Sequence, residues 1–475
     1  MSGIAFGTSG WRGIIAEDFT FTGVRAVSQA IAEHVRQQGR EAAARGVVIG
    51  YDTRFLSEAF AAQTARVLAA HDVRAFLCVR DTPTPVVAYE ILRRQAAGGV
   101  IITASHNPPE YNGIKFSSSW GGPALPEETS QIQGRANALL GGPRTPEIGL
   151  GDGEARGLIE RIDPQASYLE RLRSLVNLEV VREAGLKLVV DPLYGSAQGY
   201  LDTLLRAAGC DVVTLHNWRD PNFGGAAPEP SEAHLKELAF QVVETSAHLG
   251  LATDGDADRF GLVDADGTFL EPNYFLALLL RHLVKTRGWT GGAARSVATS
   301  HLLDAVARHL KVPLYETPVG FKYIGELIAK DVLVLGGEES AGLSVKGHVP
   351  EKDGILACLL AAELVASRGR VRLRTLLKEL YAEVGTFLTQ RRNYRLRPDQ
   401  MQRLQDRLRN PPGVLADLAV IDVNRLDGVK LLLEDGSWIL LRLSGTEPVV
   451  RVYAESSSPE RLERLMAVGE ALLGL

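Results

Sequence analysis

The sequence predicts an α/β protein with three similar mixed-sheet α/β domains and a smaller C-terminal α+β domain around a central cleft. The chain has 475 residues, which is more than one hydrophobic core usually supports. A pattern of apolar strand, helix and apolar strand occurs three times, at a spacing typical of strand–helix–strand units in buried sheets. The pattern changes near residue 380, which indicates a domain of a different kind.

The three repeats have the same order of elements. The expected strand, helix and strand are 46–52, 57–71 and 73–79 in the first repeat, 186–191, 197–208 and 210–215 in the second, and 296–299, 302–310 and 312–315 in the third. Each set has the composition of buried strands with a covering helix, as in an α/β domain.

Each repeat also contains a further apolar strand that runs into a polar loop. These strands and loops are 99–102 before TASHNP at 103–108, 249–252 before TDGDADR at 253–259, and 332–335 before GGEESAG at 336–342. Ligands of α/β sheets gather at the carboxyl ends of strands, so we expect the three loops to meet at one cleft. The alternative is three independent turns, because strand ends are often polar. The distinct chemistry of the loops favours a shared site.

The remaining segments divide the chain. A Gly- and Pro-rich connection covers 141–157 and precedes a helix at about 164–176. In the C-terminal part we expect a strand at 385–388, a charged helix at 398–409, a hairpin at 428–442 that turns at 434–436, a strand at 449–454 and a helix at 459–473. The predicted domains are 1–155, 156–264, 265–378 and 379–475.

The composition excludes several kinds of protein. Hydrophobic residues make up 45% of the chain and the net charge is -5, so neither nucleic acid nor an anionic membrane is an expected partner. The three cysteines are far apart, which fits a reducing compartment. No basic and apolar leader opens the chain, and the most apolar stretch, 275–284, is too short to span a bilayer. We expect a cytoplasmic protein whose anionic substrates would need a local cationic site.

Asp254, Asp256 and Asp258 form the most specific motif. Three carboxylates this close repel one another unless a cation lies among them, and hard oxygen ligands suit Mg²⁺. A calcium EF-hand does not fit, because Arg259 stands where that loop needs Gly and Ala265 where it needs Glu. An acidic solvated turn is the remaining alternative. Arg259 is placed to contact a phosphoryl group beside the metal.

Ser105 follows a buried strand and precedes Pro108 and Pro109, which fix the turn. A serine in such a loop can act as a nucleophile or phosphoryl carrier, although Ser, Asn and Pro are also ordinary turn residues. The segment is not the GxSxG elbow of a hydrolase. We expect His106 to orient the loop.

Lys115 follows Asn112–Gly113, a pair typical of hairpin turns that would point the lysine back toward Ser105. A lysine that lies near cations and is partly desolvated has a lowered pKa and can move a proton to or from a sugar hydroxyl. An ordinary surface lysine is the alternative.

Two further loops combine Gly, hydroxyls and Arg, as phosphate sites do. They are GTSGWRG at 7–13 and RLSGTEP at 442–448. No GxxxxGK[ST] motif occurs, so a P-loop nucleotide site is not expected. A phosphatase needs one phosphate site, whereas a metal site with a serine and a separate cationic loop suit transfer between two ends of one substrate. The polar groups between them would be Glu338, Ser340, His301 and Lys322.

Five motifs in the same order resemble the α-D-phosphohexomutases. They are GTSGWRG at 7–13, TASHNP at 103–108, DGDADR at 254–259, GEES at 337–340 and RLSGTEP at 442–448. Their order and spacing match over essentially the whole chain. The family fold, three similar α/β domains and a smaller fourth, agrees with the repeats described above.

The resemblance implies a phosphoserine enzyme. Ser105 would carry the phosphoryl group and, with the three aspartates, bind one Mg²⁺ ion. The phosphoserine would phosphorylate a hexose 1-phosphate, and the resulting glucose 1,6-bisphosphate, also the activator, would turn over in the cleft and return its other phosphoryl group to Ser105. The catalytic residues would be Ser105, Lys115 as general acid/base, His106 and Arg259. The implied substrate contacts are Arg12, His301, Lys322, Glu338, Ser340, Arg442, Ser444, Gly445 and Thr446, of which Arg442, Ser444 and Thr446 would hold the non-reacting phosphate.

The loop around Glu339 bears on the sugar. In the family, the residues at Glu338 and Ser340 contact two sugar hydroxyls, and the Glu-Glu-Ser form is similar to that of phosphoglucomutases. The glucosamine branch usually has Gln at the position of Glu339, and the manno branch often has Met. We therefore expect a phosphoglucomutase that interconverts glucose 1-phosphate and glucose 6-phosphate, with mannose phosphates as second substrates.

Other functions stay open at this point. Within the family, phosphomannomutase or phosphoglucosamine mutase is the alternative main activity. A metal-dependent sugar phosphatase and a catalytically silent sugar-phosphate-binding protein are alternatives of other classes. The expected partner is a hexose phosphate, and the chain is expected to be a monomer or a homodimer.

Overall fold

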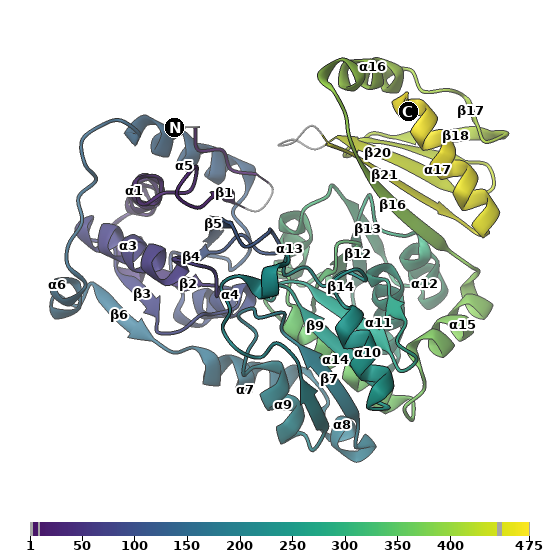
Figure 1. Ribbon diagram of the computed structural model, residues 1–475, viewed down its shortest axis with the longest axis horizontal. Helices are drawn as coiled ribbons and strands as arrows, with labels where there is room; N and C mark the ends of the chain where they lie inside the picture. The colour runs from purple at the N-terminus through teal and green to yellow at the C-terminus, as the bar shows by residue number, and fades with distance from the viewer. Residues whose placement is uncertain (1–2, 8–9, 444–448, 475) are drawn as a thin grey trace.

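The computed structural model describes residues 3–7, 10–443 and 449–474. The strands of these residues form four sheets, which follow one another along the chain (Figure 1). The first sheet lies on one side of the molecule, the second and third lie together beside it, and the fourth projects above the third (Figure 1). This arrangement confirms the predicted fold class.

The first sheet has the strand order β1-β5-β4-β2-β3-β6. Its strands are β1 (Trp11–Ile14), β2 (Val47–Tyr51), β3 (Ala75–Cys78), β4 (Gly98–Ile102), β5 (Tyr111–Ser118) and β6 (Ile159–Ile162). The helices around it are α1 (Phe21–Gln37), α2 (Arg40–Arg45), α3 (Ser57–Ala70), α4 (Thr84–Arg94), α5 (Pro126–Leu139) and α6 (Leu150–Ala155).

The second sheet has the order β11-β10-β9-β7-β8, and the third β13-β12-β14-β15. Their strands are β7 (Lys187–Asp191), β8 (Asp211–Thr214), β9 (Leu249–Thr253), β10 (Phe260–Asp264), β11 (Phe269–Leu270), β12 (Gly292–Ser296), β13 (Leu314–Thr317), β14 (Leu333–Glu338) and β15 (Gly342–Val345). The helices of this region are α7 (Gln165–Leu175), α8 (Leu178–Ala184), α9 (Leu201–Ala207), α10 (Lys236–Glu244), α11 (Pro272–Arg287), α12 (Leu302–Leu310), α13 (Phe321–Ala329), α14 (Gly354–Ser367) and α15 (Leu373–Val384), with a 3₁₀ turn at Phe223–Gly225.

The three α/β sheets repeat one topology. The parallel strands run β4-β2-β3, β9-β7-β8 and β14-β12-β13, and an antiparallel strand, β5, β10 or β15, follows on the outer side of β4, β9 or β14. Successive side chains of a strand point to opposite faces. In β2, Val47 and Ile49 pack into the core beneath α1 and α3, whereas Val48 packs with Val87 and Ile91 of α4. Because both faces are buried, the strands read as continuous apolar runs.

The fourth sheet is antiparallel, in the order β16-β21-β20-β19-β18-β17. Its strands are β16 (Leu388–Arg395), β17 (Val414–Leu415), β18 (Leu418–Asn424), β19 (Val429–Leu433), β20 (Trp438–Leu443) and β21 (Val449–Ser456), and its helices are α16 (Pro398–Arg409) and α17 (Pro459–Leu473). Trp438, Leu440 and Tyr453 pack against Val297 and Ala298, which follow β12. The fourth sheet is thus joined to the third by a small apolar contact.

Several local predictions differ from the structure. Asn112 and Gly113 lie inside β5 rather than in a hairpin turn. A Cβ at Gly113 would lie 2.5 Å from the Thr103 carbonyl oxygen, so glycine is needed here for close packing. The predicted irregular connection 141–157 contains α6, and the predicted strand 296–299 starts where β12 ends. The domain boundaries given above remain a proposal. No helix in the described part of the chain is long and apolar enough to cross a membrane.

Candidate active site

Three aspartates lie together at the turn between β9 and β10. Asp254, Asp256 and Asp258 are buried, and carboxylate oxygens of the three lie within 4.8 Å of one another. The Oδ1 atoms of Asp256 and Asp258 are buried and have no hydrogen-bond partner among the described residues. Buried carboxylate oxygens normally have partners, and clusters of hard oxygen ligands bind Mg²⁺. The three side chains therefore fit the expected magnesium ion.

Lysines from two other parts of the chain contact this acid cluster. Lys115 Nζ donates to Asp256 Oδ2 at 2.6 Å and to Asp258 Oδ2 at 3.1 Å, and Lys352 Nζ lies 3.0 Å from Asp258 Oδ2. Burial alone would raise the pKa of Asp258, but the two lysines hold it well below its usual range. The pKa of Asp254 is raised, because the group is buried and faces two other carboxylates.

The predicted lowering of the Lys115 pKa is wrong for this arrangement. Lys115 is buried, and burial by itself lowers the pKa of a lysine. The carboxylates of Asp256 and Asp258 outweigh burial and raise the pKa. A divalent cation on the same carboxylates acts on the lysine in the opposite direction. The proton affinity of Lys115 therefore depends on the charge that these aspartates carry.

Ser105 lies beside the acid cluster. It is buried in the loop after β4 and has a φ of 54°, a left-handed conformation that is uncommon for serine. Its Oγ donates a hydrogen bond to Asp254 Oδ2 at 2.8 Å and lies 3.3 Å from His106 Nδ1. Such a conformation persists only where the surrounding structure holds it.

Arg54 holds the loop that carries Ser105. All five N–H groups of its buried guanidinium are used. Nε donates to Asp52 Oδ2 at 3.1 Å, and the four Nη hydrogens reach the carbonyl oxygens of Ser105, Asn107, Pro108 and Tyr111 at 2.6–2.9 Å. Asp52 also accepts a hydrogen bond from Thr103 Oγ1, whose oxygen in turn accepts one from the Ser105 backbone N–H. Arg54 and Asp52 thus fix the backbone around Ser105 from behind.

Two further arginines lie near Ser105, one bound to its loop and one to the acid cluster. Arg12 Nη1 donates to Asn107 Oδ1 at 2.5 Å, and the backbone N–H of Arg259 donates to Asp254 Oδ1 at 3.0 Å. Burial, with the positive charges of Arg259 and Arg12, lowers the pKa of His106 well below its usual value. The imidazole is therefore neutral at neutral pH. A neutral ring beside Ser105 suits an orienting role.

Glu338, Glu339 and Ser340 lie where β14 turns toward β15. Glu338 is buried and accepts a hydrogen bond from the Gly320 N–H at 2.7 Å. Burial and the neighbouring Glu339 raise the pKa of Glu338 to about 7. Glu339 points back into the third sheet, where its Oε2 accepts a hydrogen bond from Ser296 Oγ at 2.9 Å. Ser340 is half-buried in the turn.

His301 and Lys322 occupy different surroundings. His301 lies directly before α12, and its Nε2 is 2.8 Å from Lys430 Nζ of the fourth sheet. Burial and the charge of Lys430 lower its pKa. Lys322 lies in the first turn of α13, where burial lowers its pKa. The structure therefore places His301 in the contact between the third and fourth sheets, and Lys322 at the turn that Glu338 holds.

Arg442 lies at the end of β20, and Arg451 lies directly opposite it in β21. Arg442 Nε donates to Asp427 Oδ2 at 2.9 Å. The Arg451 Nε is buried without a hydrogen-bond partner among the described residues. Burial and the like charges of Arg391 and Arg442 lower the pKa of Arg451. Ser444, Gly445 and Thr446 lie outside the described residues.

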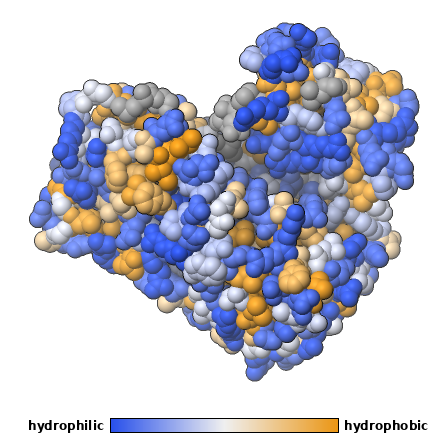
Figure 2. All heavy atoms as spheres, in the orientation of Figure 1, coloured by the Kyte–Doolittle hydropathy of each residue, from blue (hydrophilic) through white to orange (hydrophobic). Residues whose placement is uncertain are grey.

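These groups form one polar region at the carboxyl ends of three sheets. The positive charge of Arg259 offsets a small part of the rise that burial causes in the pKa of Glu338, and the negative charge of Glu339 offsets a small part of the fall that burial causes in the pKa of Arg451. The acid cluster, the loop after β14 and the fourth sheet are therefore electrostatically coupled. Figure 2 shows the surface hollowed between the part of the molecule that contains the first sheet and the part that contains the fourth sheet. This hollow fits the predicted central cleft.

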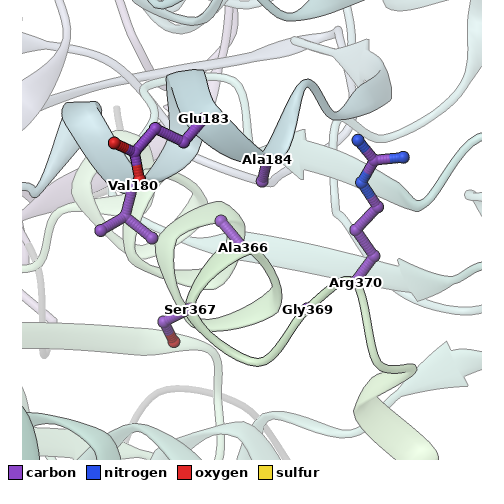
Figure 3. A pocket seen from close by; sticks show the side chains of 7 residues that line it. All are labelled: Val180, Glu183, Ala184, Ala366, Ser367, Gly369 and Arg370. Carbon is purple, nitrogen blue, oxygen red and sulfur yellow. The ribbon is translucent and has the colours of Figure 1, made fainter.

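A separate hollow of about 500 Å³ lies between α8 and the end of α14 (Figure 3). It is lined by Val180, Glu183, Ala184, Ala366, Ser367, Gly369 and Arg370. Figure 3 shows the charged ends of Glu183 and Arg370 well apart. Because none of the sequence motifs contributes to it, this hollow is not the candidate site.

Three residues of the site were not predicted from the sequence. Lys352 is a buried lysine, and only its place in a polar segment before an apolar helix hinted at a role. Arg54 follows β2 in the segment YDTR, a polar strand end like the three loops used above. Arg451 alternates with buried residues of β21, and its position opposite Arg442 follows once the two strands are paired.

Four protein-family models match the chain in order. Three are described as phosphoglucomutase/phosphomannomutase alpha/beta/alpha domains I, II and III, and they match residues 3–140, 166–267 and 271–384. The fourth is the C-terminal domain of the same description, which matches residues 398–468.

Individual relatives cover nearly the whole chain. A phosphoglucomutase/phosphomannomutase of Thermococcus kodakarensis is 30% identical over 99% of this chain and 98% of its own. A phosphoglucosamine mutase of Frankia alni is 32% identical over 98% of each chain. A crystal structure from Thermus thermophilus, assigned as a phosphomannomutase, is 33% identical and matches 100% of both chains with a TM-score of 0.86. Names with three different sugars occur at similar identity, so the comparisons leave the sugar open.

Replacing Arg54 should slow turnover without removing the binding groups. In Arg54→Lys, one ammonium cannot reach the four carbonyl oxygens that the guanidinium holds, so Ser105 should shift and kcat should fall by about a hundredfold. KM should change by less than about threefold, because the substrate contacts stay in place. Steady-state kinetics on a hexose 1-phosphate measure both constants.

The control for this test is Arg45→Lys, at a partly exposed arginine of α2 that pairs only with Glu41 among the described residues. Arg54→Met leaves the buried Asp52 without its ion-pair partner and should lower the free energy of unfolding by about 3–5 kcal/mol. If Arg54→Lys retains the wild-type kcat, Arg54 does not position the loop.

Proposed function

Because the chain belongs to the phosphoglucomutase/phosphomannomutase family of phosphohexomutases, we propose that it interconverts glucose 1-phosphate and glucose 6-phosphate through a phosphoserine at Ser105. Family membership makes the chain an enzyme of the isomerase class that transfers phosphoryl groups. The observation that carries the proposal is the Ser105 Oγ, which lies 2.8 Å from a carboxylate of the buried acid cluster.

The reaction has two half-reactions that balance. In the first, the bond between phosphorus and Ser105 Oγ breaks as phosphorus bonds to a hydroxyl oxygen of the substrate, and glucose 1,6-bisphosphate forms. In the second, the other phosphoryl group of the bisphosphate moves to Ser105, and its sugar oxygen takes up a proton. Lys115 would take up the hydroxyl proton in the first step and return it in the second, which requires positive charge on Asp256 and Asp258 to lower the Lys115 pKa that these carboxylates otherwise raise. Mg²⁺ bound by the three aspartates would supply positive charge to the transferring phosphoryl group.

Residues of the fourth sheet bind the phosphate that does not react. Arg442 and Arg451 lie opposite each other and present two guanidinium groups, a common arrangement for binding a dianion. Ser444, Gly445 and Thr446 complete this site in the proposal. The same phosphate site serves both half-reactions, because the bisphosphate has a phosphate at each end.

Glucose is the proposed sugar. Glu338 accepts a hydrogen bond through one oxygen and keeps the other for a sugar hydroxyl, with Ser340 in the adjacent turn. Glu339 is held by hydroxyls of the third sheet, so its effect on specificity is indirect. The Glu-Glu-Ser sequence supports glucose, and mannose phosphates are the proposed second substrates.

A comparison of substrates tests the activity and the sugar together. With Mg²⁺ and a trace of glucose 1,6-bisphosphate, kcat/KM should be highest for glucose 1-phosphate, lower for mannose 1-phosphate and lowest for glucosamine 1-phosphate. Ser105→Ala should remove isomerisation of all three while thermal unfolding stays as in the wild type. A preference for another sugar would keep the mechanism and contradict glucose, whereas release of inorganic phosphate without an isomer would indicate a phosphatase.

Removal of the metal should stop turnover. A chelator should abolish activity, and Mg²⁺ should restore it. Mg²⁺ should also raise the melting temperature of the wild type, because a ligand that binds only the folded state stabilises it. In Asp256→Asn one ligand charge is lost, so this rise should vanish. Asp211→Asn, at an exposed residue of β8, is the control. An unchanged response of Asp256→Asn to Mg²⁺ would place the ion elsewhere.

A further inference from the structure

The turn between β18 and β19 connects the fourth sheet to the third by polar contacts. Asn424 Nδ2 donates to Glu316 Oε2 at 2.6 Å, and the backbone N–H of Val319 donates to Asp427 Oδ2 at 3.1 Å. Lys430, the second residue of β19, donates to the carbonyl oxygen of Val297 at 2.9 Å. Three side chains of one hairpin thus reach the carboxyl ends of β12 and β13.

Asp427 has a second partner on its own sheet. The Oδ2 atom that receives the Val319 N–H also receives Arg442 Nε, at 2.9 Å. Both side chains are largely covered, with Arg442 12% and Asp427 24% exposed. A guanidinium is a rigid planar fork, so fixing Nε also fixes the direction of both Nη groups. Asp427 is the only hydrogen-bond partner of the Arg442 side chain among residues 3–7, 10–443 and 449–474.

The same turn of the third domain is held from the sugar side. The residue after Val319 is Gly320, whose N–H donates to Glu338 Oε1 at 2.7 Å. Two consecutive backbone N–H groups are therefore bound by two carboxylates: Asp427, which also binds Arg442, and Glu338, the proposed contact of a sugar hydroxyl. Lys322 follows two residues later. A shift of Arg442 would pass to this turn through one carboxylate oxygen.

We propose that Asp427 is a positioning residue that orients the phosphate-binding Arg442 and sets its distance from the sugar-binding turn at Val319 and Gly320. The proposal rests on the proposed function in one respect, the role of Arg442 in holding the non-reacting phosphate. The cleft must hold the same phosphate-to-sugar distance for the substrate and for the reversed bisphosphate. An arginine fixed against the sugar-binding turn meets that requirement, whereas an arginine free to swing does not.

A purely structural tie between two sheets is the competing explanation, and it predicts a loss of stability without a change in phosphate affinity. The test therefore measures KM for glucose 1-phosphate and competitive inhibition by inorganic phosphate in Asp427→Asn and Asp427→Ala. Asp422→Asn is the matched control, because the substitution is the same and this aspartate is an exposed residue of β18. Thermal unfolding is recorded for each variant.

In Asp427→Ala, KM and the phosphate inhibition constant should both rise about tenfold or more, and kcat should fall less. Asp427→Asn should show a smaller rise of both constants, about threefold, because an amide oxygen still accepts both N–H groups but lacks the charge. Asp422→Asn should stay within about twofold of the wild type.

A double-mutant cycle assigns the effect to Arg442. In the background of Arg442→Ala, adding Asp427→Ala should change kcat/KM by less than about twofold, since the group that Asp427 orients is gone. Unchanged phosphate inhibition in Asp427→Asn, or full additivity with Arg442→Ala, overturns the inference. If Asp427→Ala does not fold, Asp427→Asn alone decides. Wild-type kinetics in Arg442→Ala would instead overturn the phosphate site of the proposed function.

Discussion

The constraint on which the rest of the structure depends is the burial of three like charges within one turn. Asp254, Asp256 and Asp258 cannot all be ionised in a buried site without positive charge nearby. The chain supplies Lys115 from the first sheet and Lys352 from the segment before α14. The electrostatic requirement of one turn beside the second sheet is therefore met by charged groups from all three α/β domains.

The loop that carries Ser105 is held by a buried positive charge, that of Arg54. Arg54 gathers four carbonyl oxygens of the Ser105 loop, so the strained backbone is fixed from the core side while its hydroxyl faces the acid cluster. At the far end of the site, Asp427 fixes Arg442 against the third domain. Rigid supports at both ends suit a reaction in which one intermediate must bind in two opposite orientations, since both orientations must present a phosphate to the same serine.

Local patterns in the sequence were sufficient to predict the fold class. Both faces of each parallel sheet are buried, so the strands are visible in the sequence as apolar runs. Motif chemistry was also sufficient for Ser105 and the three aspartates as candidates. Contacts between distant segments were not predictable: Arg54 and Lys352 act through partners far along the chain. The raised pKa of Lys115 depends on two carboxylates of another domain. The prediction of a hairpin turn at Asn112–Gly113 was wrong for a related reason. This glycine is required by its close packing against Thr103 and not by a turn.

Transfer of a labelled phosphoryl group from Ser105 tests the central claim most directly. Enzyme carrying one labelled phosphoryl group is mixed with excess unlabelled glucose 1-phosphate, and the reaction is quenched within a single turnover. The account predicts that the label passes from the protein to glucose 1,6-bisphosphate and then to glucose 6-phosphate. Label that appears as inorganic phosphate, or that stays on the protein while glucose 6-phosphate forms, would contradict it.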